Sequence, residues 1–185
     1  LQVTGRMENL VREMLAISRM EAGAAAMKQE TVELSALIEE QLQLDAGLLE
    51  QRDQHLVREL TPGITTLGDA ALLGKVSNAS LYSPDGAEIR VWCGWQNGRP
   101  AVTVENTGAH IGEDALPHLY EAFYREECSR NRASGGSGLG LYLVKMMLDR
   151  HGAACIIENT ADGVRVSVRF VPSATSGLPA GDVVG

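Results

Sequence analysis

Residues 135–141 read Gly135-Gly136-Ser137-Gly138-Leu139-Gly140-Leu141, and the amphipathic stretch 142–150 follows directly. The spacing of apolar residues in that stretch predicts a helix that the glycine-rich segment opens. A helix start offers free backbone N–H groups and the positive end of the helix dipole, while glycines let a ligand approach the backbone. The segment therefore predicts an anion site, with a nucleotide as the first ligand to consider. A flexible loop that leads into a helix is the alternative.

The segment follows neither of the two common phosphate-binding patterns. It lacks the Gly-x-x-x-x-Gly-Lys-Ser/Thr of a P-loop, and its glycines do not have the spacing of the dinucleotide-binding fingerprint. The residues before it, 124–134, are polar and charged rather than strand-like. The glycines alone therefore do not decide the ligand.

The composition describes an ordinary globular chain. Its 185 residues are 44% hydrophobic, which is enough for one domain, or one domain with an appended element. A net charge of −8 without a basic stripe disfavours binding to nucleic acid and to anionic membranes. The three cysteines form no Cys-x-x-Cys pair, which favours reduced thiols. No apolar run is long enough to span a bilayer, and the chain does not begin with Met, so we expect any membrane attachment to lie outside these residues.

Hydrophobic periodicity and turn residues predict an α+β fold, with one mixed or mainly antiparallel sheet and helices covering one face. Asn97-Gly98, between two β-rich runs, is a strong hairpin signal. Ser35 is the expected N-cap of the second helix. The predicted helices are 7–18 (ending near Gly23), 35–51, 70–81, 113–123 and 142–150; the predicted strands are 30–34, 56–60, 64–67, 87–95, 100–106, 155–159 and 164–171.

Further motifs occur in a fixed order before the glycines. Asn78-Ala79 lies near a helix end, Asn106-Thr107-Gly108-Ala109-His110-Ile111 follows a strand, and Phe123-Tyr124-Arg125 precedes the polar segment. With Gly136-x-Gly138-x-Gly140, they resemble the N, G1, F and G2 boxes of the sensor histidine kinases of two-component systems. The resemblance extends over about residues 31–171, and 15–23 is similar to the end of the second helix of that family's dimerisation and phosphoacceptor hairpin.

The resemblance implies a division of the chain and a fold. Residues 1–24 would be the partial second hairpin helix, 30–172 the catalytic ATP-binding domain and 173–185 a disordered tail. The fold would be a two-layer α/β sandwich of the histidine-kinase/Hsp90/gyrase-type ATPase class, preceded by one amphipathic helix. Such a chain would be the cytoplasmic domain of a membrane-anchored bacterial sensor, and a homodimer through its first helix.

The resemblance also implies ATP and Mg²⁺ as cofactors and a response regulator as partner. The chain would transfer the γ-phosphoryl group of ATP to a histidine outside these residues, and thence to a response-regulator aspartate. Asn78 would tie Mg²⁺ to the nucleotide through its side-chain oxygen. Asn106 would accept a hydrogen bond from the adenine amino group, and residues between Arg125 and Ser134 would form a lid over ATP. The implied nucleotide-binding residues are Asn78, Tyr82, Asn106, Gly108, Ile111, Phe123, Arg125, Gly136, Gly138, Leu139 and Gly140.

The chain departs from the family pattern at several points. No histidine here fits the phosphoacceptor position. Gly74 stands where the family usually has another asparagine, in a helix shorter by about five residues, and five residues turn a helix by about 140°. Asn106 replaces the usual acid of the G1 box, and His110 replaces its second glycine. These departures keep a second hypothesis open: a non-catalytic or weakly nucleotide-binding module of the same fold that acts in dimerisation or partner binding. A serine kinase of the same ATPase fold is disfavoured by the hairpin-like first helix.

Overall fold

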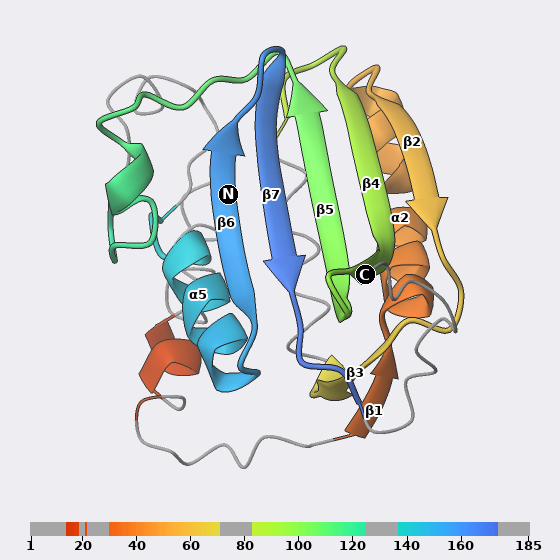
Figure 1. The fold of residues 1–185 in the computed structure, drawn as a ribbon. Helices are drawn as coiled ribbons and strands as arrows, with labels where there is room; N and C mark the ends of the chain where they lie inside the picture. The colour runs from red at the N-terminus through yellow and green to blue at the C-terminus, as the bar shows by residue number, and fades with distance from the viewer. Residues whose placement is uncertain (1–13, 19–20, 22–29, 71–82, 125–136, 174–185) are drawn as a thin grey trace, which may run out of the picture.

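The computed structural model describes residues 14–18, 21, 30–70, 83–124 and 137–173. Its main layer is a five-stranded sheet in the order β2-β4-β5-β7-β6, beside a two-stranded sheet of β1 and β3 (Figure 1). The helices and strands include β1 (Glu30–Glu33), α2 (Leu34–Gln51), β2 (His55–Leu60), β3 (Thr65–Gly68), β4 (Glu88–Gln96), β5 (Arg99–Thr107), the 3₁₀ helix η2 (Leu116–His118), α5 (Gly140–Arg150), β6 (Ala154–Asn159) and β7 (Gly163–Arg169).

The large sheet is mixed, as predicted. β2 runs parallel to β4, and the pairs β4–β5, β5–β7 and β6–β7 are antiparallel. The predicted hairpin is confirmed: Asn97 and Gly98 join β4 to β5 with φ of 51° and 71°. Two positive φ values in a two-residue loop match the twist of the flanking strands, which explains the Asn-Gly sequence.

One face of the sheet carries the hydrophobic core, because alternate residues along each strand point to the same side. α2 and α5 both pack on this face, since their buried residues belong to one cluster with those of the sheet. The predicted two-layer arrangement is therefore confirmed. The fully or nearly buried members of the cluster include Leu34, Ile38, Leu42 and Leu49 from α2, Val144 and Leu148 from α5, and Ile89, Val91, Cys93, Val104 and Val168 from the sheet.

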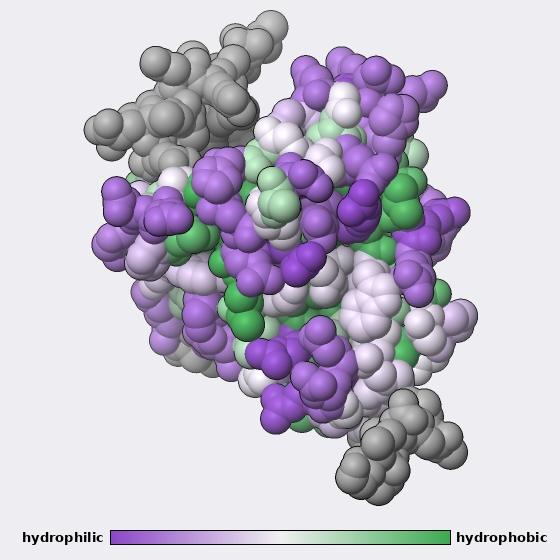
Figure 2. Space-filling view, turned by 45° about the horizontal axis from the view of Figure 1, so that its top comes forward, coloured by the Kyte–Doolittle hydropathy of each residue, from purple (hydrophilic) through white to green (hydrophobic). Residues whose placement is uncertain are grey.

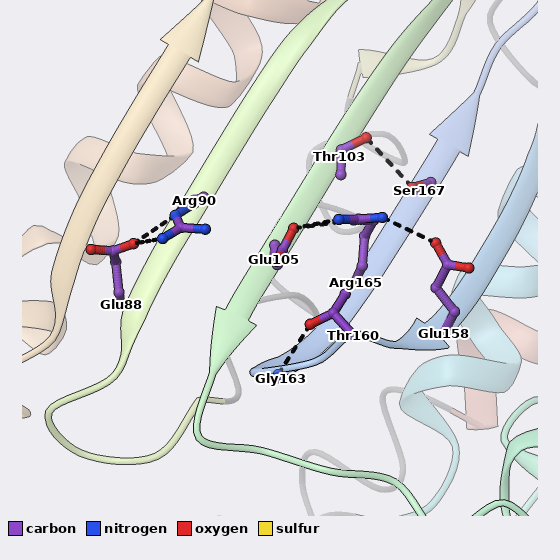
Figure 3. A network of polar contacts seen from close by, with 9 residues as sticks. All are labelled: Glu88, Arg90, Thr103, Glu105, Glu158, Thr160, Gly163, Arg165 and Ser167. Carbon is purple, nitrogen blue, oxygen red and sulfur yellow. Dashed lines mark hydrogen bonds and ion pairs between the residues drawn. The ribbon is translucent and has the colours of Figure 1, made fainter.

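The opposite face of the sheet is polar and carries ion pairs (Figure 3). Arg165 of β7 donates to Glu105 of β5 at 3.1 Å and to Glu158 of β6 at 3.5 Å, and Arg90 pairs with Glu88 at 2.6 Å. The hydrogen bond and the charge of Glu105 raise the pKa of Arg165. Exposed pairs of this kind contribute little each, so this face is held mainly by the strand hydrogen bonds.

Ser35 is not the N-cap of α2, which corrects the sequence prediction. β1 runs into the helix without a loop, so Glu33 takes the N-cap position and Ser35 lies in the first turn. The Ser35 hydroxyl donates to Glu33 Oε1 at 3.1 Å, and the same oxygen accepts the Gly63 N–H at 2.8 Å. Glu33 therefore fastens the start of α2 to the turn before β3. The strand β3 begins one residue later than predicted.

The short helical region predicted over 113–123 is confirmed only as one 3₁₀ helix. Only η2 forms there, among turns with bonds between residues three apart, such as His118 N–H to Ala115 O and Glu121 N–H to His118 O. Pro117 supplies no N–H, and that removes one bond from any α-helical continuation.

α5 ends where the sequence predicts, at His151-Gly152. His151 is buried, its Nδ1 lies 2.6 Å from Met147 O, and its Nε2 accepts the Asp69 N–H at 3.0 Å. Both contacts are hydrogen bonds only when the ring carries its proton on Nδ1. The imidazole therefore ties the end of α5 to the residue that follows β3.

Residues 14–18 are helical, as predicted for the first helix. Ala16 and Ile17 pack against Leu143 and Met147 of α5, while the exposed fraction of Met14 is 50%. The helix predicted over 70–81 lies outside the described residues beyond its first position, as does the tail from 174. Within the described ranges, no helix combines the length and apolar character that crossing a membrane requires.

Candidate nucleotide site

Asn106 lies at the end of β5, on the helix-covered face of the sheet, and is only 8% exposed. It pairs with Ile89 of β4 on one side and Val164 of β7 on the other. Its carboxamide makes no hydrogen bond to another residue within the described part of the chain. A buried amide near the end of a central strand, as here, is suited to a ligand that offers both a donor and an acceptor.

Gly163 holds the backbone of Asn106 in place from the next strand. A Cβ at Gly163 would lie 1.8 Å from the Asn106 carbonyl oxygen and 2.9 Å from Thr107 Cα. Only glycine therefore allows β7 to pair this closely with the end of β5. The sequence shows Asp162-Gly163 only as a turn signal, so this supporting residue was not predicted.

Gly108, just after β5, has φ of 76° and is exposed. The nearest atom to an added Cβ would be Pro84 Cγ at 3.8 Å, which leaves open space above this backbone. Its N–H donates to Asp162 O at 2.9 Å, so the segment after β5 is fastened to the β6–β7 turn. The predicted role, to let a flat ligand approach the backbone, is compatible with this geometry.

Ile111 is partly buried and is held by one side chain. Its N–H donates to Asn159 Oδ1 at 3.0 Å, and its carbonyl accepts from Asn159 Nδ2 at 2.7 Å. Asn159 ends β6 and was not among the predicted site residues. No local signal marks it, because its partner lies 48 residues away in the sequence.

Phe123 and Gly138 contact each other, and so bring together the two ends of the segment 124–137. The Phe123 N–H donates to Gly138 O at 3.0 Å, and φ is 66° at Phe123 and 76° at Gly138. A Cβ at Gly138 would lie 2.8 Å from the Phe123 carbonyl carbon. Phe123 is 60% exposed and lines an apolar hollow with Leu139, Tyr142 and Ile17, so it is not a core aromatic.

The N-terminus of α5 presents free backbone donors. Leu139 is its N-cap residue, buried and without a side-chain cap; the Leu139 N–H donates to Ser137 Oγ at 3.1 Å. The N–H groups of the first helical residues, 140–142, have no acceptor inside the helix. An added Cβ at Gly140 would meet nothing within 4 Å. These donors and the helix dipole favour a phosphate.

The predicted site residues in the described ranges lie toward one end of the fold. α5 packs on β6 and runs in the opposite direction, so its N-terminus points toward the end of the sheet where β5 and β6 finish (Figure 1). Figure 2, in which the top of Figure 1 comes forward, shows a mostly hydrophilic surface with smaller apolar patches between. Four predicted residues, Asn78, Tyr82, Arg125 and Gly136, lie outside the described residues.

The donors and acceptors named above at this end are the Asn106 and Asn159 carboxamides, the Ser137 hydroxyl and backbone groups, which bind and orient rather than exchange protons. The thiols are placed differently. Burial, with a smaller effect of Glu33, raises the pKa of Cys93 to about 12. Burial also raises the pKa of Cys155, which accepts the Tyr120 O–H at 3.1 Å. Neither group is set up as a nucleophile. Among the described residues, no three His, Cys, Asp or Glu side chains gather as metal ligands.

The sheet is covered by helices on one face, and the buried amide near the end of β5 lies toward the same end of the sheet as the N-terminus of α5, which describes a two-layer α/β architecture. The family model described as "Histidine kinase-, DNA gyrase B-, and HSP90-like ATPase" matches residues 71–175, more than half of the chain. The chain belongs to this family. Together with the curated sensor proteins reported next, this match confirms the resemblance to sensor histidine kinases.

Curated relatives and a solved structure agree. The chain is 30% identical over 180 residues to sensor protein VanSB of Enterococcus faecalis, covering 95% of this chain and 40% of that protein. It is 33% identical over 181 residues to the phosphate regulon sensor protein PhoR of Pseudomonas aeruginosa, covering 93% and 40%. Full-length ShkA in complex with AMPPNP shares the fold, with a TM-score of 0.77 at 20% identity over 94% of this chain and 38% of that one. The chain thus spans about two fifths of the length of these two sensors.

Proposed function

We propose that the chain is the ATP-binding catalytic part of a two-component sensor histidine kinase. It transfers the γ-phosphoryl group of ATP to a histidine outside these residues, from which the group passes to a response-regulator aspartate. One observation carries the proposal: the buried Asn106 carboxamide and the open N-terminus of α5 lie toward the same end of the sheet. A base-binding amide and a phosphate-binding helix start are the two contacts that a nucleotide needs.

We infer a role for each described residue of the site. Asn106 hydrogen-bonds the adenine, and Gly108 leaves room for the ring. The N–H groups at the start of α5 bind phosphate oxygens, and the contact of Gly138 with Phe123 fixes that start. In phosphoryl transfer the protein mainly positions reactants and stabilises charge, which suits a site built from amides and backbone donors.

Mg²⁺ is inferred to accompany the nucleotide. When bound, it neutralises charge on the phosphate oxygens of ATP. Asn78 is the residue proposed to hold it, through one hard oxygen ligand, with phosphates and waters as the others. The described residues contain no cluster that would bind the ion without ATP. We therefore expect metal binding to depend on the nucleotide.

The partners follow from the same proposal. Residues 30–172 form the ATP-binding unit, and 1–24 contribute to a hairpin through which two copies associate. Both VanSB and PhoR are named as sensor proteins. Histidine kinase ThkA, whose fold this chain shares with a TM-score of 0.69 at 16% identity over 90% of this chain and 49% of that one, has been solved in complex with the response regulator TrrA. These names support a response regulator as partner and a sensor as the longer protein, and we propose that this longer protein is anchored in a membrane.

The test is calorimetric titration with a non-hydrolysable ATP analogue and Mg²⁺. Asn106→Leu keeps the volume of the side chain and removes its hydrogen bonds, so we expect affinity to fall at least about tenfold. Thr103→Val is the matched control, a polar-to-apolar change on the open face of the same strand, and should bind like the unmodified chain.

Two results would overturn the proposal. One is no binding to the unmodified chain at millimolar analogue, which would favour the non-catalytic module. The other is equal binding by Asn106→Leu and the unmodified chain.

A further inference from the structure

The turn between β6 and β7 holds the segment that follows β5. Asn159 makes two hydrogen bonds to the Ile111 peptide groups, at 3.0 and 2.7 Å, and Asp162 O accepts the Gly108 N–H at 2.9 Å. Among the described residues, the two Asn159 bonds are the hydrogen bonds that tie 109–111 to the rest of the fold. Without the two Asn159 bonds, residues 109–111 would have no hydrogen bond to the rest of the described fold and would be held by chain connectivity at their two ends and by the packing of partly buried side chains such as Ile111.

Asn159 shares a row of the sheet with Asn106. Asn159 pairs with Val164, and Val164 pairs with Asn106, so the three side chains stand on the same face at the same level. Asn106 and Asn159 are two strand spacings apart, or about 10 Å. One amide at this end of the sheet is left for a ligand, while the other is engaged by the loop beside it.

The chemistry of the contact requires a carboxamide. One group must accept from the Ile111 N–H while the other donates to the Ile111 carbonyl, and the side chain of Asn carries an acceptor and a donor side by side. An aspartate at this position would keep the acceptor, but while ionised it would set a second oxygen against the Ile111 carbonyl. The residue cannot be exchanged for a similar one without loss of a bond.

We propose that Asn159 is a positioning residue for the nucleotide: it acts through Ile111 and sets the shape of the Gly108–Ile111 segment around the base. The inference rests on the proposed function. It adds Asn159, the last residue of β6, which is inferred to make no contact with the ligand itself.

The experiment compares ADP binding, in the presence of Mg²⁺, to the unmodified chain and to Asn159→Ala, together with hydrogen exchange of the Ile111 amide. Loss of both bonds should weaken ADP binding about tenfold or more and speed exchange at Ile111. Thr160→Ala is the matched control. It removes the 3.0 Å bond from the Gly163 N–H to Thr160 Oγ1 inside the same turn (Figure 3), without touching Ile111. This control should leave ADP affinity within about twofold.

Asn159→Asp adds a second measurement, the pH dependence of ADP affinity, which depends on the donor that contacts the Ile111 carbonyl. At pH 8 its ADP affinity should fall as in the alanine variant. As the pH is lowered to about 4, near the ordinary pKa of an aspartate, protonation of about half of the carboxyl groups restores a donor, so affinity relative to the unmodified chain at the same pH should partly recover. Glu158, which precedes Asn159 in the sequence, pairs with Arg165, and both side chains stand on the face of the sheet opposite to Asn159.

Three results would overturn the inference. They are equal ADP binding by Asn159→Ala and the unmodified chain, equal weakening by Thr160→Ala, and no recovery of Asn159→Asp at low pH. Failure of the unmodified chain to bind ADP or the ATP analogue would overturn the proposed function and this inference together. The first three outcomes overturn the inference alone.

Discussion

Replacing Gly138 with alanine places a methyl group against the backbone of Phe123. An ideal Cβ would lie 2.8 Å from the Phe123 carbonyl carbon and 2.9 Å from its Cα, so one of the two backbones must move. Gly138 also has φ of 76°, which costs an L-residue about 1–2 kcal/mol. Movement breaks the 3.0 Å hydrogen bond from Phe123 to Gly138, which contributes about 1 kcal/mol. The sum is about 2–3 kcal/mol.

Gly63→Ala is a closely matched control, because Gly63 has φ of 77° and an added Cβ would meet nothing within 4 Å. Urea unfolding should show a loss of about 1–2 kcal/mol for this control, which carries only the backbone cost. Gly138→Ala should lose about 1 kcal/mol more, and its affinity for an ATP analogue should fall by between tenfold and a hundredfold. Gly63→Ala should bind the analogue like the unmodified chain. Equal unfolding midpoints for the two variants, with unchanged binding, would refute the reasoning.

Three further changes test the supports of the fold. Gly163→Ala forces a methyl group within 1.8 Å of Asn106 O and should cost about 3 kcal/mol or more by urea unfolding; an unchanged midpoint would contradict that contact. His151→Phe keeps an aromatic side chain but removes the acceptor of the Asp69 N–H, and should lower the free energy of unfolding by about 1–3 kcal/mol. A variant as stable as the unmodified chain would argue against this hydrogen bond. Burial raises the pKa of the Cys93 thiol from 9.0 to about 12, so between those pH values this thiol loses its proton only in the unfolded chain. Stability should therefore fall as pH rises through that window, by up to about 1.4 kcal/mol per unit from this thiol. Cys93→Ala should lessen the slope, and an equal slope in the variant would contradict the shift.

Local patterns in the sequence predict the elements whose causes are local. The Asn97-Gly98 hairpin depends on two residues with positive φ, and α5 depends on its own apolar period, so both are found where expected. The sequence predictions are wrong where an adjoining element or residue determines the local structure. Glu33, and not Ser35, occupies the N-cap position of α2 because β1 runs into the helix without a loop, and only η2 forms around Pro117.

The residues of the candidate site also fall into those that local motifs predict and those that they do not. Asn106, Gly108 and Gly138 stand in recognisable motifs, and the structure adds that Gly138 is needed for its contact with Phe123. Gly163 and Asn159 were not predicted, because their partners come from strands and loops about 50 residues earlier in the chain. Close approach of two backbones leaves no trace in a single sequence.

We propose that a nucleotide binds between the end of β5 and the start of α5. Titrating ¹⁵N-labelled chain with a non-hydrolysable ATP analogue and Mg²⁺, and following its amide resonances by NMR, tests this most directly. Within the described residues, the largest shifts should fall at Asn106–Ile111 and Gly138–Tyr142. Amides of β2, at the far edge of the sheet, should stay unchanged. No shifts at millimolar analogue, or shifts confined to residues remote from these two segments, would contradict the account.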